Sequence, residues 1–509
     1  MQRIASTQPY PLHTSAATRA IEAAAAAALA PHTLMQRAGQ AAARLALALA
    51  PHARRVWIAC GAGNNGGDGL EAAALLHASG HPVVVTLLGS PDQLPADARQ
   101  SWQRARAAGV PLADAPPALG PQDLCVDALL GLGLSATPRA QPPDARLLQW
   151  LALLHAQAAP TLCLDLPSGL VADSGAWAPG FGFLAAPPAG VRHTLSLLTL
   201  KPGLFTAWGR DAAGQVWFDD LGVDAAAVPG AAPCATLAGP PAAAARAHAS
   251  HKGSFGDVAV IGGEGLALRG QGMGGAALLA AGAALHAGAG RVLLALLDDG
   301  TTCALPAQPE LMLRRCDALA LDQGAVVCGC GGGQAVAAVL ARVLQQARRL
   351  VLDADALNAI AADTALRALL RQRSRQDGCA TVLTPHPLEA ARLLGSSAAA
   401  VQGDRLGAAQ ALAHELGCVV LLKGSGSIVA APGQLPLVNP TGCALLATGG
   451  TGDVLAGLAG ARLAACASSD MPAAFAAAAR ACWEHGSAAD AWPAGRALTA
   501  GRLLRTLHA

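Results

Sequence analysis

The segment 447–453, Ala-Thr-Gly-Gly-Thr-Gly-Asp, combines a glycine-rich turn with one carboxylate, and a helix-like run over 454–458 follows it directly. Its glycines let the backbone approach an anion closely, and the start of a helix offers unpaired N–H groups and a positive dipole end to a phosphate. Asp453 would repel that phosphate unless it accepts a proton from a hydroxyl group or binds a metal ion. The pattern therefore favours phosphoryl chemistry. The alternative is a turn in which Asp453 only caps a helix.

The segment 423–427, Lys-Gly-Ser-Gly-Ser, is a second candidate for phosphate binding. It follows a buried strand predicted over 419–422, and its lysine and backbone N–H groups can both hold a nucleotide phosphate. Its distance from 447–453 along the chain would allow the two glycine loops to stand on either side of one nucleotide. Without that neighbour, a surface lysine beside a hairpin turn explains the segment equally well.

Two further strand ends in the second half carry polar side chains. His386 stands between two prolines, which on its own is more typical of a rigid loop than of a catalytic histidine. Asp353 and Asp355 follow a predicted strand over 350–352. A helix cap and a metal-linked pair explain these two aspartates equally well.

Three polar loops in the first half also follow predicted strands, at 63–69, 127–133 and 165–170. Because ligands of open α/β sheets bind at the carboxyl ends of the strands, we expect these loops to meet at one edge. Their carboxylate, amide and hydroxyl oxygens suit a hard cation as well as a sugar. Taken singly, each aspartate in them is more typical of a turn or a cap. The 63–69 loop is not the G-x-G-x-x-G dinucleotide fingerprint.

The elements that must position these residues alternate between helix and strand. In the first half, helices are predicted within 14–50 and over 70–79, and strands over 56–61, 82–88, 123–129, 161–166 and 194–200. In the second half, a helix is predicted over 275–286, and strands over 257–261, 291–296, 325–328, 350–352, 381–384 and 419–422. This alternation predicts the α/β class for both halves.

The length of 509 residues exceeds the size at which single cores stop growing, so two domains are expected. Residues 224–250 are rich in alanine and proline and have few hydrophobic anchors. We therefore predict domains over 1–223 and 251–509, joined by a linker over 224–250.

The composition argues against several classes of protein. A formal net charge of +2, without a basic run, gives little support to nucleic-acid binding. Thirteen cysteines without a Cys-x-x-Cys pair argue against a disulfide framework or a zinc site, and predict reduced thiols in a cytoplasmic protein. The N-terminus shows no apolar signal core. The apolar tract 274–297 is better explained by a helix and a buried strand than by a membrane span.

The first half resembles the NAD(P)H-hydrate epimerase domain through 63–69, 127–133, 165–169 and the Lys-Pro-Gly-Leu segment 201–204. The resemblance implies a Rossmann-like three-layer fold and a potassium ion held by Asn65, Asp127 and Ser168. It also implies that a hydrated nicotinamide nucleotide contacts the following residues: Asn64, Asn65, Gly66, Gly67, Asp68, Gly131, Leu132, Gly133, Leu134, Ser135, Ala136, Thr137 and Asp165. One departure is Gln36, where the family pattern has glutamate.

Nearly all of 251–509 resembles the ADP-dependent NAD(P)H-hydrate dehydratase domain, a branch of the ribokinase-like fold, through five ordered motifs. The resemblance implies two sets of contacts. The hydrated nucleotide would face Ala276, Gly331, His386 and Asp453, and the adenine nucleotide would be held by Lys423, Gly424, Ser425, Gly426, Ser427 and Gly452. Two departures are Gly-Cys-Gly-Gly-Gly at 329–333, in place of Gly-Pro-Gly-Leu-Gly, and the segment 441–446.

A mechanism that uses both halves follows as a hypothesis. Asp453 accepts the substrate hydroxyl proton during attack on the terminal phosphoryl group of ADP, and phosphate then leaves. Asp165 moves a proton while the two isomers of the hydrate interconvert. A magnesium ion is expected with ADP on general grounds. We expect a homo-oligomer that acts on small molecules, without nucleic-acid or membrane partners.

Two other functions compete with this one. The same fold and glycine–aspartate loop serve small-molecule kinases, for example of a vitamin-precursor alcohol. The first half could also be a nucleotide-binding scaffold without catalysis.

Overall fold

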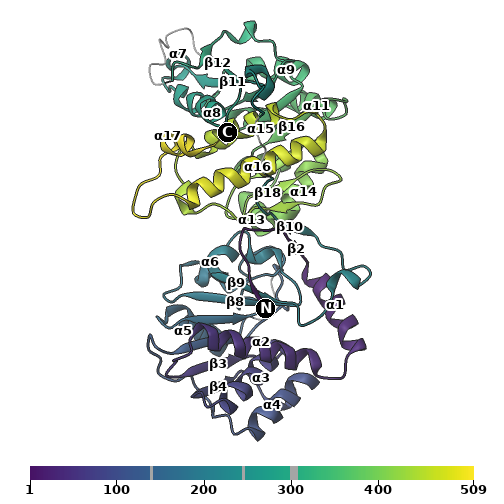
Figure 1. Ribbon diagram of the computed structural model, residues 1–509, viewed down its shortest axis with the longest axis vertical. Coiled ribbons are helices and arrows are strands. Elements are labelled where there is room, and N and C mark those ends of the chain that lie inside the picture. The colour runs from purple at the N-terminus through teal and green to yellow at the C-terminus, as the bar shows by residue number, and fades with distance from the viewer. Residues whose placement is uncertain (138–141, 243–246, 298–307, 509) are drawn as a thin grey trace. The chain divides into compact units, whose positions relative to one another are not determined.

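The computed structural model describes residues 1–137, 142–242, 247–297 and 308–508, and these form two compact units (Figure 1). Unit 1 comprises Met1–Ala5 and Tyr10–Thr236, and unit 2 comprises Ser6–Pro9 and Leu237–Ala509. The division falls within the segment predicted as a linker. That segment contains a short 3-10 helix at Ala225–Ala227 and a strand, β10, at Ala235–Leu237. Its residues 243–246 lie outside the described part of the chain.

Unit 1 contains an eight-stranded sheet in the order β1-β9-β8-β7-β6-β3-β4-β5. All its neighbouring strands run parallel except β1 and β9, which are antiparallel. The strands are β1 (Gln2–Arg3), β3 (Val56–Cys60), β4 (Val83–Leu87), β5 (Leu112–Ala113), β6 (Leu124–Ala128), β7 (Thr161–Leu164), β8 (Arg192–Leu197) and β9 (Gln215–Asp219). Strand β2 (Tyr10–Leu12) also belongs to unit 1 but is not part of this eight-stranded sheet.

Helices cover both faces of this sheet. They are α1 (Ser15–Ala28), α2 (Thr33–Leu49), α3 (Asn64–Ala78), α4 (Ala96–Ala107), α5 (Ala145–Ala156) and α6 (Gly209–Ala213). Successive side chains of a strand point to opposite faces. Ile58 and Cys60 of β3 accordingly belong to the core formed with α2 and α3, whereas Trp57 and Ala59 belong to the core formed with α5. The Rossmann-like three-layer arrangement implied by the resemblance is therefore confirmed.

Unit 2 also contains a mostly parallel sheet of the α/β class. Its strands run in the order β13-β12-β11-β14-β15-β16-β17-β18-β19, parallel as far as β17 and antiparallel beyond it. They are β11 (Asp257–Glu264), β12 (Arg291–Leu297), β13 (Met312–Leu313), β14 (Ala325–Cys328), β15 (Arg349–Leu352), β16 (Ala380–Leu383), β17 (Val419–Leu422), β18 (Ile428–Ala430) and β19 (Leu437–Val438).

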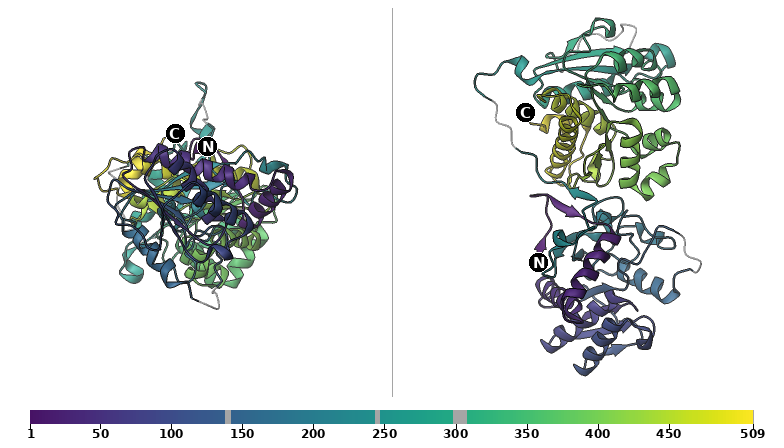
Figure 2. Two further views of the ribbon diagram at one scale, coloured as in Figure 1. Left: turned by 90° about the horizontal axis from the view of Figure 1, so that it is seen from below. Right: turned by 90° about the vertical axis from the view of Figure 1, so that its right-hand side faces the viewer.

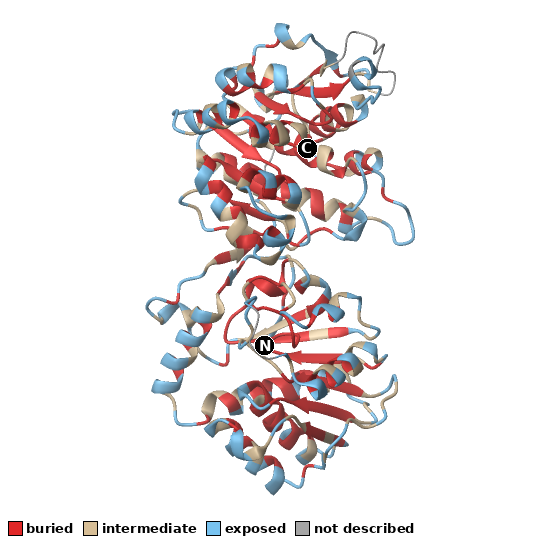
Figure 3. Cartoon of the chain, turned by 180° about the vertical axis from the view of Figure 1, so that it is seen from behind, coloured by how far each residue is buried: buried red, intermediate tan, exposed pale blue. Residues whose placement is uncertain are grey.

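The helices of unit 2 flank that sheet, as the right-hand view of Figure 2 shows. They are α7 (Leu266–Arg269), α8 (Gly274–His286), α9 (Ala337–Gln346), α10 (Asp355–Ala362), α11 (Thr364–Arg373), α12 (Pro387–Leu394), α13 (Ala398–Gly403), α14 (Arg405–Leu416), α15 (Thr451–Ala464), α16 (Met471–Asp490) and α17 (Ala500–Leu503). Buried residues follow the strands and the inner helix faces in both units (Figure 3). The α/β class predicted for both halves is confirmed.

Small residues let helix α15, which carries the glycine–aspartate motif, pack closely against α8. A Cβ atom at Gly457 would lie 1.9 Å from the carbonyl oxygen of Ala280, so only glycine fits there. Alanine-rich faces of both helices belong to one buried core with the sheet. The backbone around Asp453 is therefore held by a rigid contact between two helices.

The apolar tract 274–297 forms helix α8 followed by strand β12, as the sequence predicts. Within the described residues, no helix is both long and apolar enough to cross a membrane. Twelve of the thirteen cysteines lie in the described ranges, and each of these twelve is a free thiol.

Candidate active sites

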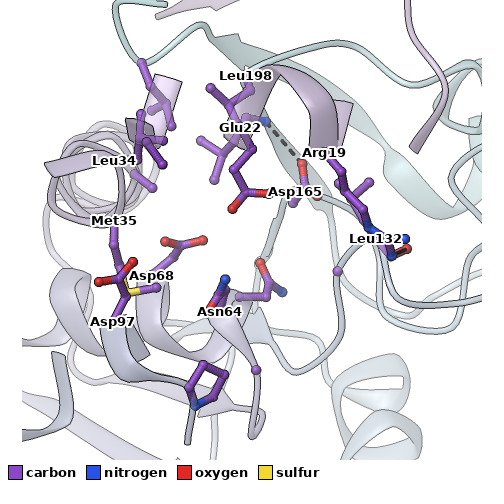
Figure 4. Close-up of a pocket in the computed structure, with 18 of the residues that line it drawn as sticks. Arg19, Glu22, Leu34, Met35, Asn64, Asp68, Asp97, Leu132, Asp165 and Leu198 are labelled. Atoms are coloured by element: carbon purple, nitrogen blue, oxygen red, sulfur yellow. Dashed lines mark hydrogen bonds between the residues drawn. The ribbon is translucent and has the colours of Figure 1, made fainter. Parts of the chain in front are cut away.

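A cavity of about 800 Å³ opens in unit 1 where the strands of the sheet end (Figure 4). Several residues that the resemblance assigns to substrate binding line this cavity: Asn64, Asn65, Asp68, Gly131, Leu132, Gly133 and Asp165. Others do not belong to the described residues that line it: Gly66, Gly67, Leu134, Ser135, Ala136 and Thr137. The loops after β3, β6 and β7 thus meet at one edge, but only part of each loop faces the cavity.

Gly66 and Gly67 serve close packing inside helix α3. A Cβ atom at Gly66 would lie 1.9 Å from the carbonyl oxygen of Gly61, and one at Gly67 would lie 2.6 Å from the sulfur of Met35. Helix α3 begins at Asn64, so most of the segment predicted as a loop forms its first turns. Glycines are poor helix formers, and this is why the sequence suggested a later start.

Asn65, Asp127 and Ser168 lie together beside the cavity. The Ser168 hydroxyl donates to Asp127 Oδ1 at 2.6 Å, and the Ser168 amide donates to Asp127 Oδ2 at 3.0 Å. The side-chain amide of Asn65 donates to the carbonyl oxygen of Leu130 at 3.1 Å. Its carbonyl oxygen Oδ1 is buried and has no hydrogen-bond partner among the described residues. Burial raises the pKa of Asp127, although its hydrogen bonds with Ser168 oppose that shift.

The Asp165 carboxylate faces the cavity from the end of β7. Asp165 has a φ of 64°, a left-handed conformation that aspartate tolerates better than most residues. Its Oδ1 atom accepts hydrogen bonds from the backbone N–H of Leu197, at 3.3 Å, and from the ammonium group of Lys201. Lys201 is fully buried and also donates to the carbonyl oxygen of Leu197 at 2.8 Å. The 201–204 motif is visible in the sequence, but nothing there predicts a role for Lys201 in the site.

Other carboxylates surround Asp165 (Figure 4). Burial and the negative charge of Asp165 raise the pKa values of Asp68 and Glu22 above their ordinary values. Glu22 and Asp97 line the cavity but were absent from the predicted site. Glu22 lies in the alanine-rich helix α1, where a lone glutamate gives no signal of function in the sequence.

In unit 2, Asp453 stands in the first turn of helix α15, whose N-cap is Gly450 with a φ of 90°. Its carboxylate is half-buried, and burial together with the negative charge of Asp353 raises its pKa to about 6. One oxygen each of Asp353 and Asp453 and the sulfur of Cys330 lie within 4.8 Å of one another. Among the described residues, these three form the group that could hold a metal ion.

Lys423 connects this carboxylate pair to the predicted phosphate loop. Its ammonium group lies 2.7 Å from Asp353 Oδ1 and 4.0 Å from Glu389 Oε2. Burial alone would lower the pKa of Lys423, but Asp353 and Glu389 together raise it. A Cβ atom at Gly452 would lie 3.3 Å from the Lys423 nitrogen, so the two glycine loops approach each other at the ammonium group.

Asp353 and Asp355 have separate roles. Asp353 accepts from the Thr384 hydroxyl at 2.7 Å as well as pairing with Lys423. Asp355 lies in the first turn of α10 and accepts from the backbone N–H of Gly333 at 2.8 Å, which fixes the 329–333 loop. Asp353 thus belongs to the charged cluster, whereas Asp355 holds a loop.

His386 caps helix α12, and its Nδ1 accepts from the backbone N–H groups of Leu388 and Glu389 at 3.1 and 3.2 Å. Its Nε2 lies 3.2 Å from Glu389 Oε1. Burial and the charge of Lys423 lower the pKa of His386, and burial raises that of Glu389 to about 7. His386 therefore caps α12 next to Glu389, which itself lies near Lys423.

The remaining predicted contacts lie on loops and in the first turn of α8. Gly331 has a φ of 59°, and a Cβ atom there would lie 2.8 Å from the Cβ atom of Ala276, so these two predicted residues are neighbours. In the 423–427 loop, the hydroxyl of Ser427 accepts from the backbone N–H of Gly424 at 3.2 Å. Ser425 and Gly426 complete this loop.

His485 is a further residue near the site that was not predicted from the sequence. It is buried in helix α16, and its Nε2 lies 2.9 Å from the carbonyl oxygen of Thr451 in the first turn of α15. Burial lowers the pKa of His485 to about 4, so the ring is neutral near pH 7 and donates this hydrogen bond from Nε2. A single histidine in an alanine-rich helix carries no sequence signal for this role.

Comparison with known proteins identifies relatives of both halves of the chain. The family model described as NAD(P)H-hydrate dehydratase matches residues 258–508, and the one described as YjeF-related protein N-terminus matches residues 31–203. A bifunctional NAD(P)H-hydrate repair enzyme of Escherichia coli is 36% identical over 92% of this chain and 87% of its own length. The ADP-dependent (S)-NAD(P)H-hydrate dehydratase of Neisseria meningitidis is 43% identical over 51% of this chain and 84% of its own.

Among solved structures, an ADP/ATP-dependent NAD(P)H-hydrate dehydratase of Bacillus subtilis, co-crystallized with ATP and Mg²⁺, is similar to this chain. It is 28% identical and covers 52% of this chain and 91% of its own, with a TM-score of 0.43. The full-length match to the repair enzyme, together with the two family models, confirms the resemblance of both halves. The chain belongs to the family of bifunctional NAD(P)H-hydrate repair enzymes.

Proposed function

We propose that the protein repairs hydrated NADH and NADPH. Unit 2 dehydrates the S isomer of the hydrate with ADP, which gives AMP and phosphate, and unit 1 interconverts the R and S isomers. The observation that carries this proposal is the half-buried carboxylate of Asp453 in the first turn of α15, next to the Lys423–Asp353 pair. That arrangement provides a proton acceptor and an anion-binding helix end at one place.

In the dehydration, the substrate hydroxyl loses its proton to Asp453 as its oxygen bonds to the β-phosphorus of ADP and AMP departs. The backbone N–H groups at the start of α15 and the Lys423 ammonium group stabilise the charge that develops on the phosphoryl oxygens. The ring nitrogen lone pair then expels phosphate, and loss of a ring proton restores the dihydronicotinamide. Phosphorylation thus converts hydroxide, a poor leaving group, into phosphate.

A divalent cation fits the same place. Asp353 and Asp453 offer the carboxylate oxygens that magnesium prefers, and the clustering of these two acidic groups is unfavourable unless positive charge compensates it. A bound magnesium ion would neutralise the nucleotide phosphates. Lys423 supplies part of this compensation from the protein itself.

The raised pKa of Asp453 predicts the pH dependence of dehydration. Below about pH 6 the carboxylate is protonated and cannot accept the substrate proton, so kcat/KM for the hydrate should fall about tenfold per pH unit there. Above pH 6 this group no longer limits the rate. Initial rates of dihydronicotinamide formation between pH 4.5 and 8 at saturating ADP measure the profile, and a flat acid limb would argue against Asp453 as the proton acceptor.

In the epimerisation, we propose that Asp165 moves a proton during reversible loss and return of the substrate hydroxyl. The buried Lys201 contacts the same carboxylate and keeps it oriented toward the cavity. The unpartnered Oδ1 of Asn65, the Asp127 carboxylate and the Ser168 hydroxyl fit a potassium ion, which prefers such oxygen ligands. A bound potassium ion would order the loops around the substrate.

This assignment predicts that potassium affects one activity only. Replacing K⁺ with a tetraalkylammonium salt at equal ionic strength should slow epimerisation at least about tenfold, because the Asn65 and Asp127 oxygens then lack their cation. Dehydration of the isolated S isomer should not change. Chromatography of the two isomers without ADP measures epimerisation, and equal rates in both salts would contradict a potassium site.

The alternative of a vitamin-precursor kinase is less well supported, because the full-length relatives are named as repair enzymes. The scaffold alternative for unit 1 conflicts with the buried Asp165–Lys201 pair at the cavity wall, which has the chemistry of a catalytic site. We place the protein in the cytoplasm, consistent with its free thiols, and expect a homo-oligomer.

A further inference from the structure

Helix α1 forms part of the wall of the cavity that Asp165 lines, and side-chain contacts fix it in place. The hydroxyl oxygens of Thr18 and Thr199 lie 2.7 Å apart. Nη2 of Arg19 donates to the carbonyl oxygen of Leu132 at 2.8 Å. These contacts join α1 to the segments that follow β8 and β6 at the carboxyl edge of the sheet. Side chains on the cavity face of α1 therefore have defined positions.

Glu22 is the one acidic residue of α1, and it lies on that cavity face. It follows Thr18 by four residues and precedes Ala26 by four, so the three side chains lie on one side of the helix. Its carboxylate points into the cavity, toward the carboxylates of Asp68 and Asp165 (Figure 4). Within the described part of the chain, no residue donates a hydrogen bond to Glu22 or forms an ion pair with it. A half-buried carboxylate is therefore free to contact a substrate in this cavity.

Glu22 and Asp165 differ in the groups that surround their carboxylates. Asp165 accepts hydrogen bonds from the ammonium group of Lys201 and the backbone N–H of Leu197, and both donors favour its charged form. Burial and the negative charge of Asp165 raise the pKa of Glu22, although Lys201 and Arg19 oppose that shift. Neighbouring carboxyl groups do not all ionise together, so a proton shared by this pair resides on Glu22.

We propose that Glu22 is the general acid of the epimerisation and that Asp165 is the base. Glu22 donates its proton to the hydroxyl oxygen of the hydrate. The C–O bond breaks, its electron pair leaves with water, and the ring nitrogen lone pair forms a C=N bond. Water then adds to the same carbon, its proton passes to Asp165, and the nitrogen regains its lone pair. Addition to the opposite face of the ring gives the other isomer, and proton exchange with solvent resets the two carboxyl groups. This role rests on the proposed epimerisation.

Glu22→Gln in the full-length protein tests this role. Glutamine keeps the size of the side chain but has no acidic proton. The kcat of epimerisation should therefore fall about 10²–10⁴-fold, while the KM for the hydrate changes less than about threefold. The midpoint of thermal unfolding should not fall, because one charge is removed from a cluster of carboxylates. Chromatography of the two isomers without ADP measures the rate, and dehydration of the purified S isomer should be unchanged.

Asp123→Asn is the matched control. Asp123 is a half-buried carboxylate of unit 1 that does not belong to the described residues lining the cavity. It accepts from the backbone N–H of Gly120 at 2.7 Å, and asparagine can accept the same hydrogen bond. This variant should epimerise the hydrate at the wild-type rate.

Chemical rescue separates proton transfer from a structural role of Glu22. Glu22→Ala opens a space in the cavity wall, and formic acid that enters this space can supply the missing proton. Formate should therefore raise the epimerisation rate of Glu22→Ala at least about fivefold over chloride at equal ionic strength and pH. It should not raise the rate of Glu22→Gln, because glutamine still fills the space.

The outcomes distinguish the role of Glu22 from the proposed function. If the wild type does not interconvert the isomers, the proposed epimerisation fails and this role fails with it. If the wild type and Glu22→Gln epimerise at equal rates, only the role of Glu22 is overturned. A slow Glu22→Ala variant that formate does not accelerate would also overturn it. So would loss of epimerisation in Asp68→Asn with full activity in Glu22→Gln, because the acid would then be Asp68.

Discussion

We expect Asp453→Asn to lower the rate of ADP-dependent dehydration by about 10²–10⁴-fold, the usual effect of removing a general base. Asparagine keeps the size and hydrogen-bonding capacity of the side chain at the start of α15, but it cannot take the substrate proton. Epimerisation in unit 1 should be unchanged, because its carboxylates belong to another cavity. Dihydronicotinamide absorbance with ADP and the purified S isomer measures the loss.

The matched control is Asp470→Asn in the same unit. Asp470 caps helix α16 and accepts from the backbone N–H of Ala473 at 2.8 Å, and asparagine caps a helix as well as aspartate does. This variant should therefore retain both stability and activity. If Asp453→Asn dehydrates the hydrate at the rate of Asp470→Asn, Asp453 does not accept the proton.

The opposite pattern should follow from Asp165→Asn. Epimerisation should fall about 10²–10⁴-fold, since the proton carrier is removed, while dehydration of the S isomer continues. With a racemic hydrate and excess ADP, repair should then stop after about half of the substrate, because the R isomer no longer converts. Asparagine is chosen because, like aspartate, it tolerates the left-handed backbone at this position.

This variant also leaves Lys201 buried without its carboxylate, which typically costs about 3–5 kcal/mol of stability. Asp165→Asn with Lys201→Met removes both charges and should recover much of that loss in thermal unfolding, but not epimerisation. Asp144→Asn, at the N-cap of α5, is the unit 1 control and should keep both activities. Recovery of epimerisation in the double variant would show that the single variant fails through misfolding alone.

The sequence predicted the buried strands well because they are continuous apolar runs between glycine or proline residues. β14 and β17 begin and end at the predicted residues. The short edge strands were not predicted. Strands of two residues, such as β5 and β13, are too short to show a periodic pattern of apolar residues. The end of β8 was placed too late, because the left-handed turn at Leu198 is set by tertiary packing.

Site residues that lie in a recognisable motif could be predicted from the sequence. Residues that come near a site only through tertiary packing could not. The motifs around Asp453, Lys423 and Asp165 were visible as glycine-rich or strand-end segments. Glu22 and His485 were not, because each is an isolated polar residue in an alanine-rich helix. Their proximity to the two sites follows from helix packing that local sequence does not encode.

The most direct test of the central claim is the stoichiometry of products from the S isomer of hydrated NADH with ADP as the sole phosphoryl donor. We expect NADH, AMP and phosphate to form in equal amounts, since each phosphorylation is followed by elimination. Absorbance of the dihydronicotinamide, nucleotide chromatography and a phosphate assay on one reaction give the three quantities. Accumulation of a stable phosphorylated hydrate, with AMP formed but neither NADH nor free phosphate released, would contradict the account and favour a kinase.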